Sequence, residues 1–189
     1  MILKSIQKVK LYELLFFIDK DLVEQQRMKT CPFCGSPLHI SNYPRKPRGG
    51  PDNLPDQLLI RHSLCCAKEE CRKRVLPVSC RFWGRKVYWS VVILTIMTLQ
   101  QSRTEGYSAG KIIRLFGISR HTLKRWIFYF KKVFPLSDKW RRISGRIDFE
   151  INPNDIPGTL VLFFIEQLES VEEGLIRSLR LFLGGSEVF

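Results

Sequence analysis

Two pairs of closely spaced cysteines constrain this chain more than any other feature of its sequence. The first pair is Cys31-Pro32-Phe33-Cys34, followed by Gly35, and the second is Cys66 and Cys71, with four residues between them. A short turn lets both sulfurs of a pair face one point, and two such turns supply the four thiolates of a tetrahedral Zn²⁺ site. Four protein ligands leave no open position for a catalytic water. The predicted cofactor is therefore one structural Zn²⁺ held by Cys31, Cys34, Cys66 and Cys71.

The remaining cysteines and two histidines are weaker candidate ligands. Cys65 and Cys66 are adjacent, and neighbouring strand residues point to opposite faces, so only one of them can face the ion. The shorter spacer to Cys71 favours Cys66, with Cys65 as the open alternative. Cys80 follows Cys71 at a distance and is predicted to be a buried thiol. His39 and His62 are interpreted as ordinary surface or core residues.

The apolar segments favour metal-binding thiols over disulfides. The run from Leu11 to Ile18 is short, contains Glu13 and lacks the small-residue cleavage site of a secretory signal. The stretch from Val87 to Leu99 is also shorter than the roughly 20 residues of a membrane span. We therefore expect a cytoplasmic, nucleoid-associated protein without membrane segments, whose paired thiols stay reduced.

Helix signals follow the cysteine region. Residues 86–101 are apolar nearly all round, as in a helix buried in a small bundle. Two amphipathic helices come next, with Ser108 and Ser119 as N-caps and Gly117 as the left-handed residue that ends the first helix. A joining turn of only three residues, Gly117-Ile118-Ser119, is typical of a helix-turn-helix.

These signals predict an α-rich α+β fold. A small β zinc ribbon is expected to carry an inserted Pro/Gly-rich loop, because residues 42–51 cannot be helical. A helix-turn-helix domain and a C-terminal amphipathic helix follow it. The predicted boundaries are an N-terminal helix at 1–29, the ribbon at 30–80, the helix-turn-helix domain at 81–135, a linker at 136–158 and a helical tail at 159–189, which Gly174 can break in two.

The charge of the chain is concentrated in its middle. The formal net charge is +13, and residues 72–146 hold 18 Lys and Arg against only Glu105 and Asp138. A segment so poor in acids has no internal counter-ions, and a phosphate backbone is the obvious external partner. A basic helix face that merely keeps the protein soluble is the alternative interpretation.

The predicted DNA contacts lie on the two amphipathic helices. The second helix, from Ser119 to about Lys132, is expected to enter a major groove, where side chains near its start reach base edges. Side chains of the first helix are expected to contact backbone phosphates instead. The residues with these predicted roles are Lys111, Arg114, Ser119, Arg120, His121, Thr122, Lys124 and Arg125.

Three motifs, in this order, carry a family resemblance. They are Cys31-Pro-Phe-Cys-Gly, then Cys66-x4-Cys71 followed by Arg-Lys-Arg, then Gly-Ile-Ser-Arg-His-Thr-Leu-Lys-Arg-Trp at 117–126. Together they resemble the zinc-ribbon plus helix-turn-helix region of bacterial insertion-sequence transposases and transposon-associated DNA-binding proteins. The resemblance covers about residues 31–135 and implies double-stranded DNA, such as the end of a mobile element, as the partner.

A departure from that family, rather than the resemblance itself, predicts a protein without catalytic activity of its own. Transposases of this kind carry a carboxylate triad on a ribonuclease-H-like fold, which needs more chain than residues 147–189 supply. Asp148, Glu150, Asp155 and Glu166 are interpreted as surface acids rather than a two-metal site. The expected function is non-catalytic, sequence-specific DNA binding, with the tail pairing two copies or docking a mobile-element protein. A transcriptional regulator, an RNA-binding ribonucleoprotein component and, least favoured, a small nuclease are the alternatives.

Overall fold

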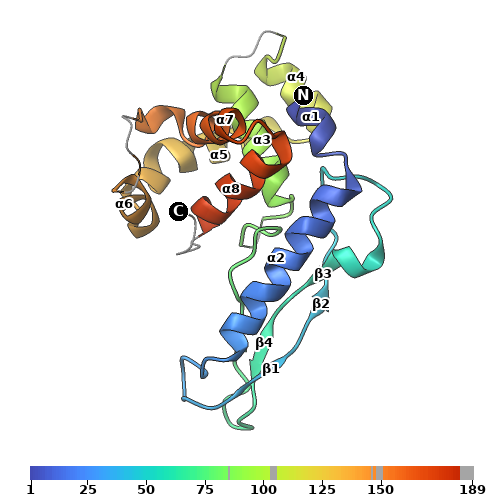
Figure 1. Cartoon of the computed structure of the whole chain (residues 1–189), viewed down its shortest axis with the longest axis vertical. Coiled ribbons are helices and arrows are strands. Elements are labelled where there is room, and N and C mark those ends of the chain that lie inside the picture. The colour runs from blue at the N-terminus through green and yellow to red at the C-terminus, as the bar shows by residue number, and fades with distance from the viewer. Residues whose placement is uncertain (85, 103–105, 146, 148–150, 184–189) are drawn as a thin grey trace. The chain divides into compact units, whose positions relative to one another are not determined.

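The computed structural model describes residues 1–84, 86–102, 106–145, 147 and 151–183 of the 189. The chain forms two compact units, Gln7–Trp89 and the combination of Met1–Ile6 with Ser90–Phe189. We call them the cysteine unit and the helical unit. Helices and a small antiparallel sheet confirm the predicted α+β class (Figure 1).

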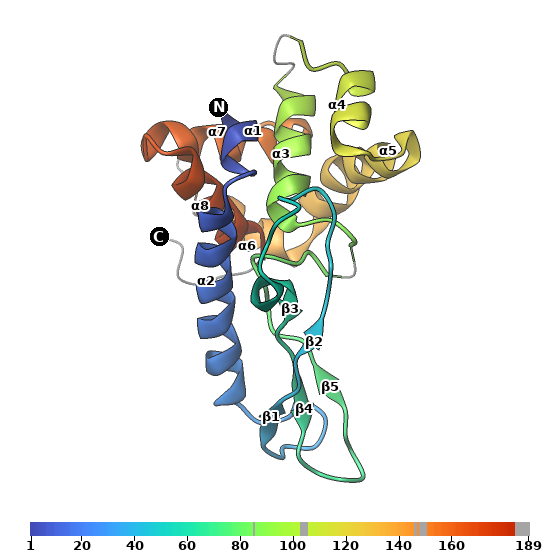
Figure 2. The same cartoon turned by 90° about the vertical axis from the view of Figure 1, so that its right-hand side faces the viewer.

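The cysteine unit combines one long helix with short strands. Helix α2 (Val9–Arg27) lies along the strands in both views (Figures 1 and 2). A three-stranded antiparallel sheet has the order β1-β4-β5, and a second pair of strands, β2 and β3, is also antiparallel. The strands are β1 (Leu38–Ile40), β2 (Tyr43–Pro44), β3 (Ile60–Arg61), β4 (Leu64–Cys66) and β5 (Arg74–Val75), with a 3₁₀ turn, η1 (Asp56–Leu59), before β3.

The alternation of side chains along β4 sets the core of this unit. Leu64 and Cys66 are buried, while Cys65 between them is half-buried on the other face. In the antiparallel register Leu38 lies opposite Cys66, and Leu64 lies opposite Val75. Val23 of α2 packs onto the same cluster, so the helix covers the face of the sheet that also carries cysteines.

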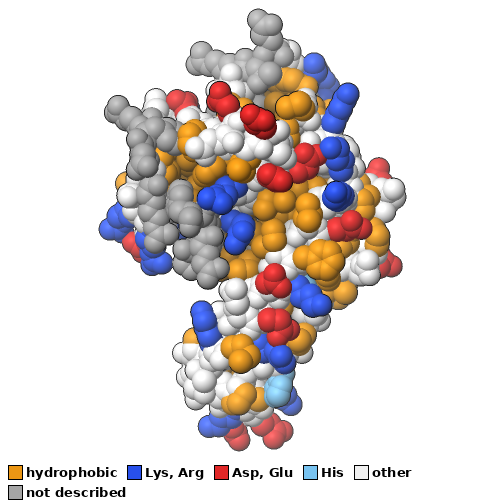
Figure 3. Space-filling view, in the orientation of Figure 1, with side chains coloured by type: hydrophobic (Ala, Val, Ile, Leu, Met, Phe, Trp, Pro, Cys, Tyr) orange, Lys and Arg blue, Asp and Glu red, His pale blue; other side chains and the backbone are white. Residues whose placement is uncertain are grey.

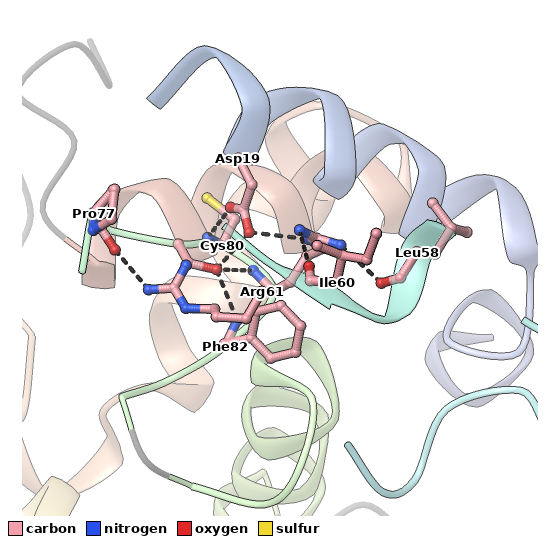
Figure 4. A network of polar contacts seen from close by, with 9 residues as sticks. Asp19, Leu58, Ile60, Arg61, Pro77, Cys80 and Phe82 are labelled. Carbon is pink, nitrogen blue, oxygen red and sulfur yellow. Dashed lines mark hydrogen bonds and ion pairs between the residues drawn. The ribbon is translucent and has the colours of Figure 1, made fainter. Parts of the chain in front are cut away.

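A buried ion pair ties α2 to the rest of the cysteine unit (Figure 4). Asp19 Oδ2 lies 3.0 Å from Arg81 Nε, and both side chains are almost fully buried. The Asp19 carboxylate also accepts hydrogen bonds from the Cys80 backbone N–H and the Ser79 hydroxyl. The Arg81 guanidinium donates to the carbonyl oxygens of Leu58 and Ile60 as well. Both buried charges are thus paired and hydrogen-bonded, which burial of charge requires.

The helical unit is built around α3 (Ser90–Gln101). Every residue of α3 from Ser90 to Leu99 is buried, which explains why this helix is apolar nearly all round. Helices α4, α7 and α8 pack against it. The surrounding elements are α1 (Ile2–Ser5), α4 (Ala109–Phe116), α5 (Arg120–Phe128), the π-helical turn η2 (Tyr129–Val133), η3 (Phe134–Leu136), α6 (Asp138–Ser144), η4 (Pro153–Asp155), α7 (Gly158–Gln167) and α8 (Val171–Leu183).

The structure differs from the predicted boundaries at three elements before the tail. The segment 1–29 is two helices, because Lys8 has an extended backbone and the chain passes from one unit to the other there. The helix expected over 86–101 begins at Ser90. The segment 136–158, expected to be a linker, contains α6, which Ser137 caps and whose Trp140 and Ile143 are buried.

The described part of the C-terminal tail, residues 159–183, packs into the core of the helical unit. It forms two helices that separate at residues 168–170, where Glu169 has a φ of 49°. Gly174 does not break the tail: it lies inside α8, where a Cβ would fall 2.6 Å from the backbone nitrogen of Ile165 in α7. Of the apolar stripe expected to pair two copies, Leu160 and Phe164 are buried inside this unit, whereas Leu168 is exposed.

Among the described residues, every helix is either too short or too polar to cross a lipid bilayer.

Candidate metal centre and nucleic-acid interface

The first cysteine pair sits in a tight turn before β1. The Gly35 N–H donates to the Cys31 carbonyl, and the Cys31 N–H donates to the Ser36 carbonyl, both at 2.8 Å. Gly35 has a φ of 74°, in the left-handed region that glycine adopts without strain. This turn places the sulfurs of Cys31 and Cys34 toward the same point, as the spacing predicted.

The second cysteine pair sits in the turn between β4 and β5. Cys66 ends β4, and its N–H donates to the Lys73 carbonyl across the turn. The N–H groups of Cys71 and Arg72 both donate to the Lys68 carbonyl, and Arg72 has a φ of 43°. Because Arg72 is left-handed, the chain turns back toward β5 directly after Cys71.

The four predicted cysteines form one cluster, and this is the feature of the site that the structure confirms. The sulfurs of Cys31, Cys34, Cys66 and Cys71 all lie within 4.8 Å of one another. The Cys31 and Cys71 sulfurs are 4.0 Å apart, and those of Cys34 and Cys66 are 3.4 Å apart. Tetrahedral sulfurs bonded to zinc at about 2.3 Å would be about 3.8 Å apart. The cluster therefore has the size and the donor set of a tetrahedral thiolate site.

Two thiols of the cluster differ in how readily they ionise. Hydrogen bonds from Ser36 and from the neighbouring thiols lower the pKa of Cys34 to about 6. Burial raises the pKa of Cys66 to about 12. Four thiolates at these distances would repel one another, so all four would be deprotonated together only around a bound cation.

The structure separates the ligand candidates that the sequence left open. Cys65 is outside the cluster and its thiol donates to the Arg72 carbonyl, so Cys66 is the member of the adjacent pair that faces the other sulfurs. Cys80 is buried, as predicted. His62 is buried against the ring of Phe16, and burial together with the Arg81 charge lowers its pKa. His39 is exposed on β1.

Helices α4 and α5 begin where the sequence predicted, and α4 ends there too, whereas α5 ends at Phe128 and continues as a π-helical turn toward the predicted end at about Lys132. The Ser108 hydroxyl accepts from the Lys111 N–H at 3.3 Å, and the Ser119 hydroxyl accepts from the Thr122 N–H at 3.0 Å. Gly117 is left-handed, with a φ of 57°, and the N–H of Ile118 returns to the Ile113 carbonyl. Ile118 in the turn is buried, so the three-residue connection is anchored in the core of the helical unit.

The predicted contact residues occupy the outer surface of these two helices. Leu123 and Trp126 are the buried residues of α5. Thr122 is half-buried, and its hydroxyl lies 3.0 Å from that of Ser119. The Lys111 ammonium lies over the Tyr107 ring, 5.0 Å from its centre. The exposed members of the predicted set are Lys111, Arg114, Ser119, Arg120, His121, Lys124 and Arg125.

The charged side chains of α4 and α5 themselves are all basic or histidine. The sequence contains no acidic residue from Gly106 to Ser137, so no carboxylate in that segment offsets the basic side chains of α4 and α5. Over much of the face that Figure 3 shows, acidic, basic and apolar side chains are intermixed. The α4–α5 surface can therefore attract a polyanion in a way that a mixed surface cannot.

Two arginines of the cysteine unit have structural roles. Arg45 donates to the carbonyls of Gly84 and Lys86 and lies over the Phe82 ring. Arg74 donates to the Ser63 hydroxyl and lies over the Tyr43 ring. These guanidinium groups hold the inserted loop and strand β5 in place, a role that a charge count does not reveal.

The acids considered for a nuclease are described only in part. Asp148 and Glu150 lie outside the described residues. Asp155 in η4 and Glu166 in α7 are both exposed.

Neither a protein-family model nor a curated protein matches the sequence, and no solved structure matches the fold.

Proposed function

We propose that this protein is a zinc-stabilised, sequence-specific DNA-binding protein without catalytic activity of its own. The observation that carries this proposal is the exposed, acid-free surface of α4 and α5, two capped helices joined by a three-residue turn. In a helix-turn-helix, the second helix lies in the major groove with its N-terminal residues at base edges. Arg120 and His121 occupy that position at the start of α5.

The cysteine cluster supports a structural zinc ion. Its four sulfurs match a closed tetrahedral site in number and spacing, and turns before β1 and after β4 present them. Zinc bound there would join the two turns of the small antiparallel sheet, which is the role of zinc in a ribbon. The resemblance to insertion-sequence proteins supports a mobile element as the source of the bound DNA.

The first experiment is selection of bound sequences from random duplex DNA by the zinc-loaded protein at near-physiological salt. We expect a reproducible motif, because Arg side chains in the major groove discriminate guanine by bidentate hydrogen bonds worth about 1–3 kcal/mol each. The Arg120→Ala and Arg125→Ala variants should lose part of that motif. Enrichment of no sequence would contradict specific DNA binding.

A matched pair of variants separates base reading from charge. Lys111→Ala, on α4, should weaken binding to all duplexes alike and reduce the salt dependence by about one phosphate contact. Arg120→Ala should instead change which duplex is preferred. Equal losses on all sequences for both variants would indicate only a basic surface. Stronger binding to structured RNA than to the selected duplex would favour the ribonucleoprotein alternative.

A further inference from the structure

Phe128 is the least expected residue on the outer surface of α5. Its side chain is 62% exposed, whereas the aromatic residues Trp126 and Phe130 on either side of it are 3% and 1% exposed. A single exposed apolar side chain is common on protein surfaces and needs no explanation by itself. The position of Phe128 relative to the basic residues of the helix is what makes it informative.

The helical repeat places Phe128 on the same stripe as the proposed DNA contacts. At 3.6 residues per turn, positions three, four and seven residues apart share one face of a helix. Phe128 follows His121 by seven residues, Lys124 by four and Arg125 by three. All three of those residues are exposed, and the buried residues Leu123 and Trp126 lie on the opposite side.

More basic residues continue beyond Phe128. Lys131 and Lys132 are exposed in the π-helical turn that prolongs α5, so the ring has exposed cations before and after it along the chain. A surface that only kept the protein soluble would gain nothing from an aromatic ring at this position. A surface that enters a DNA groove would desolvate the ring together with its charged neighbours.

We propose that Phe128 is a specificity-determining residue that contacts the 5-methyl group of a thymine in the major groove. This inference rests on the proposed function. The thymine methyl is the apolar group that base edges present in the major groove, where a Phe ring is one of its natural partners. The stacked faces of the bases are out of reach there, which excludes ring stacking as the contact.

The position of that thymine follows from helix geometry. Seven residues at 1.5 Å each separate His121 from Phe128 by about 10 Å along α5. Base steps are 3.4 Å apart along the DNA axis, and a helix in the groove is inclined to that axis, so this distance spans at most about three base steps. The thymine should therefore lie within about three base pairs of the bases read by the start of α5. It should occupy one fixed place in the motif selected by the wild-type protein.

The test removes the methyl group and the ring separately. In the selected duplex, each thymine is replaced in turn by deoxyuridine, which lacks only the methyl group, and binding is measured for wild type and Phe128→Ala. One replacement should weaken wild-type binding about fourfold, the fold-change for losing the burial of one methyl-sized group. Phe128→Ala should bind more weakly than wild type and be insensitive to that same replacement.

Control variants keep the result interpretable. Leu136→Ala removes another apolar side chain, 80% exposed and outside the stripe, and should bind like wild type. Phe128→Leu should retain part of the sensitivity to deoxyuridine, because it keeps an apolar contact. The salt dependence should be the same for wild type and Phe128→Ala, since no charge is removed.

The outcomes distinguish this inference from the function on which it rests. If the wild-type protein selects no motif, the proposed function fails and the role of Phe128 fails with it. If a motif is selected but no deoxyuridine replacement weakens binding, or Phe128→Ala keeps the full sensitivity, only the role of Phe128 is overturned.

Discussion

Cys65 and Cys66 show how one position along a strand decides the chemistry of a side chain. Both are cysteines and both precede the same turn, yet only Cys66 faces the other sulfurs, because neighbouring strand residues point to opposite faces. Spacing alone favoured Cys66 without deciding it. The register of β1 against β4, with Leu38 opposite Cys66, is what brings that sulfur to the first turn.

We predict that Cys34→Ser abolishes stoichiometric zinc binding and that Cys65→Ser does not. Removing one of four thiolates opens the proposed site, whereas the Cys65 thiol only donates to a backbone carbonyl. Zinc content per purified chain, measured by atomic emission, checks both variants. Equal zinc content in the wild type and Cys34→Ser would remove Cys34 from the site.

The Asp19–Arg81 pair leads to a prediction about stability. Asp19→Ala should destabilise the cysteine unit by about 3–5 kcal/mol, because it leaves the Arg81 guanidinium buried without its counter-ion. Glu24→Ala is the matched control: it breaks the exposed pair of Glu24 with Arg27 on the same helix and should cost less than about 1 kcal/mol. Urea unfolding of the zinc-loaded protein measures both. Similar losses for the two variants would contradict the importance of the buried pair.

At the level of elements, local signals predicted α4 and α5 and missed α6. The serine caps and Gly117 act within a few residues of their own helix, so their effect is readable in the chain. Ser137 is an equally good cap, and the sequence prediction overlooked it. The start of α8 had a signal too, since Ser170 accepts a hydrogen bond from the Glu173 N–H in a Ser-x-x-Glu sequence.

Gly174 allows the close approach of α7 and α8. A Cβ at this position would lie 2.6 Å from the Ile165 nitrogen and 2.7 Å from its Cα. Relieving this clash requires a shift of the α7 backbone, whereas a flexible side chain could simply move aside. We predict that Gly174→Ala destabilises the helical unit by about 1–3 kcal/mol, although alanine is the better helix former.

Gly110→Ala in α4 is the control for that prediction. The nearest atom to its added Cβ is the Arg114 Nη1 at 3.9 Å, so the substitution meets no obstruction. It should stabilise the protein by up to about 1 kcal/mol through helix propensity. Thermal unfolding of the two variants should therefore shift in opposite directions, and a stabilising Gly174→Ala would rule out the tight contact.

At the scale of the whole molecule, the chain builds two cores that do not follow sequence order. Residues 1–6 belong with residues 90–189, and residues 7–89 form the cysteine unit between them. The chain therefore enters the helical unit, leaves it and returns. Helices α1 and α8 come from opposite ends of the described chain and pack against each other. No local sequence signal predicts this pairing.

We predict that removing zinc unfolds the cysteine unit and leaves the helical unit folded. The free energy of binding a structural zinc, about 10–16 kcal/mol, is comparable to the whole stability of a domain. Hydrogen exchange after chelation should show lost protection in β1 and β4 and retained protection in α3, α7 and α8. Restored protection on adding zinc is the control, and equal loss in both units would contradict independent cores.

The local chemistry of this protein can be read from its sequence. The paired cysteines, the serine caps, the left-handed Gly117 and the acid-free basic segment each act over a few residues, so their positions can be read directly. Four other features depend on the folded protein: which thiol of the adjacent pair faces the others, the packing of α7 and α8 into the core, the helix contact at Gly174 and the exposure of Phe128 beside the basic residues of α5. These depend on which surfaces pack together, and burial is a property of the whole fold rather than of any segment.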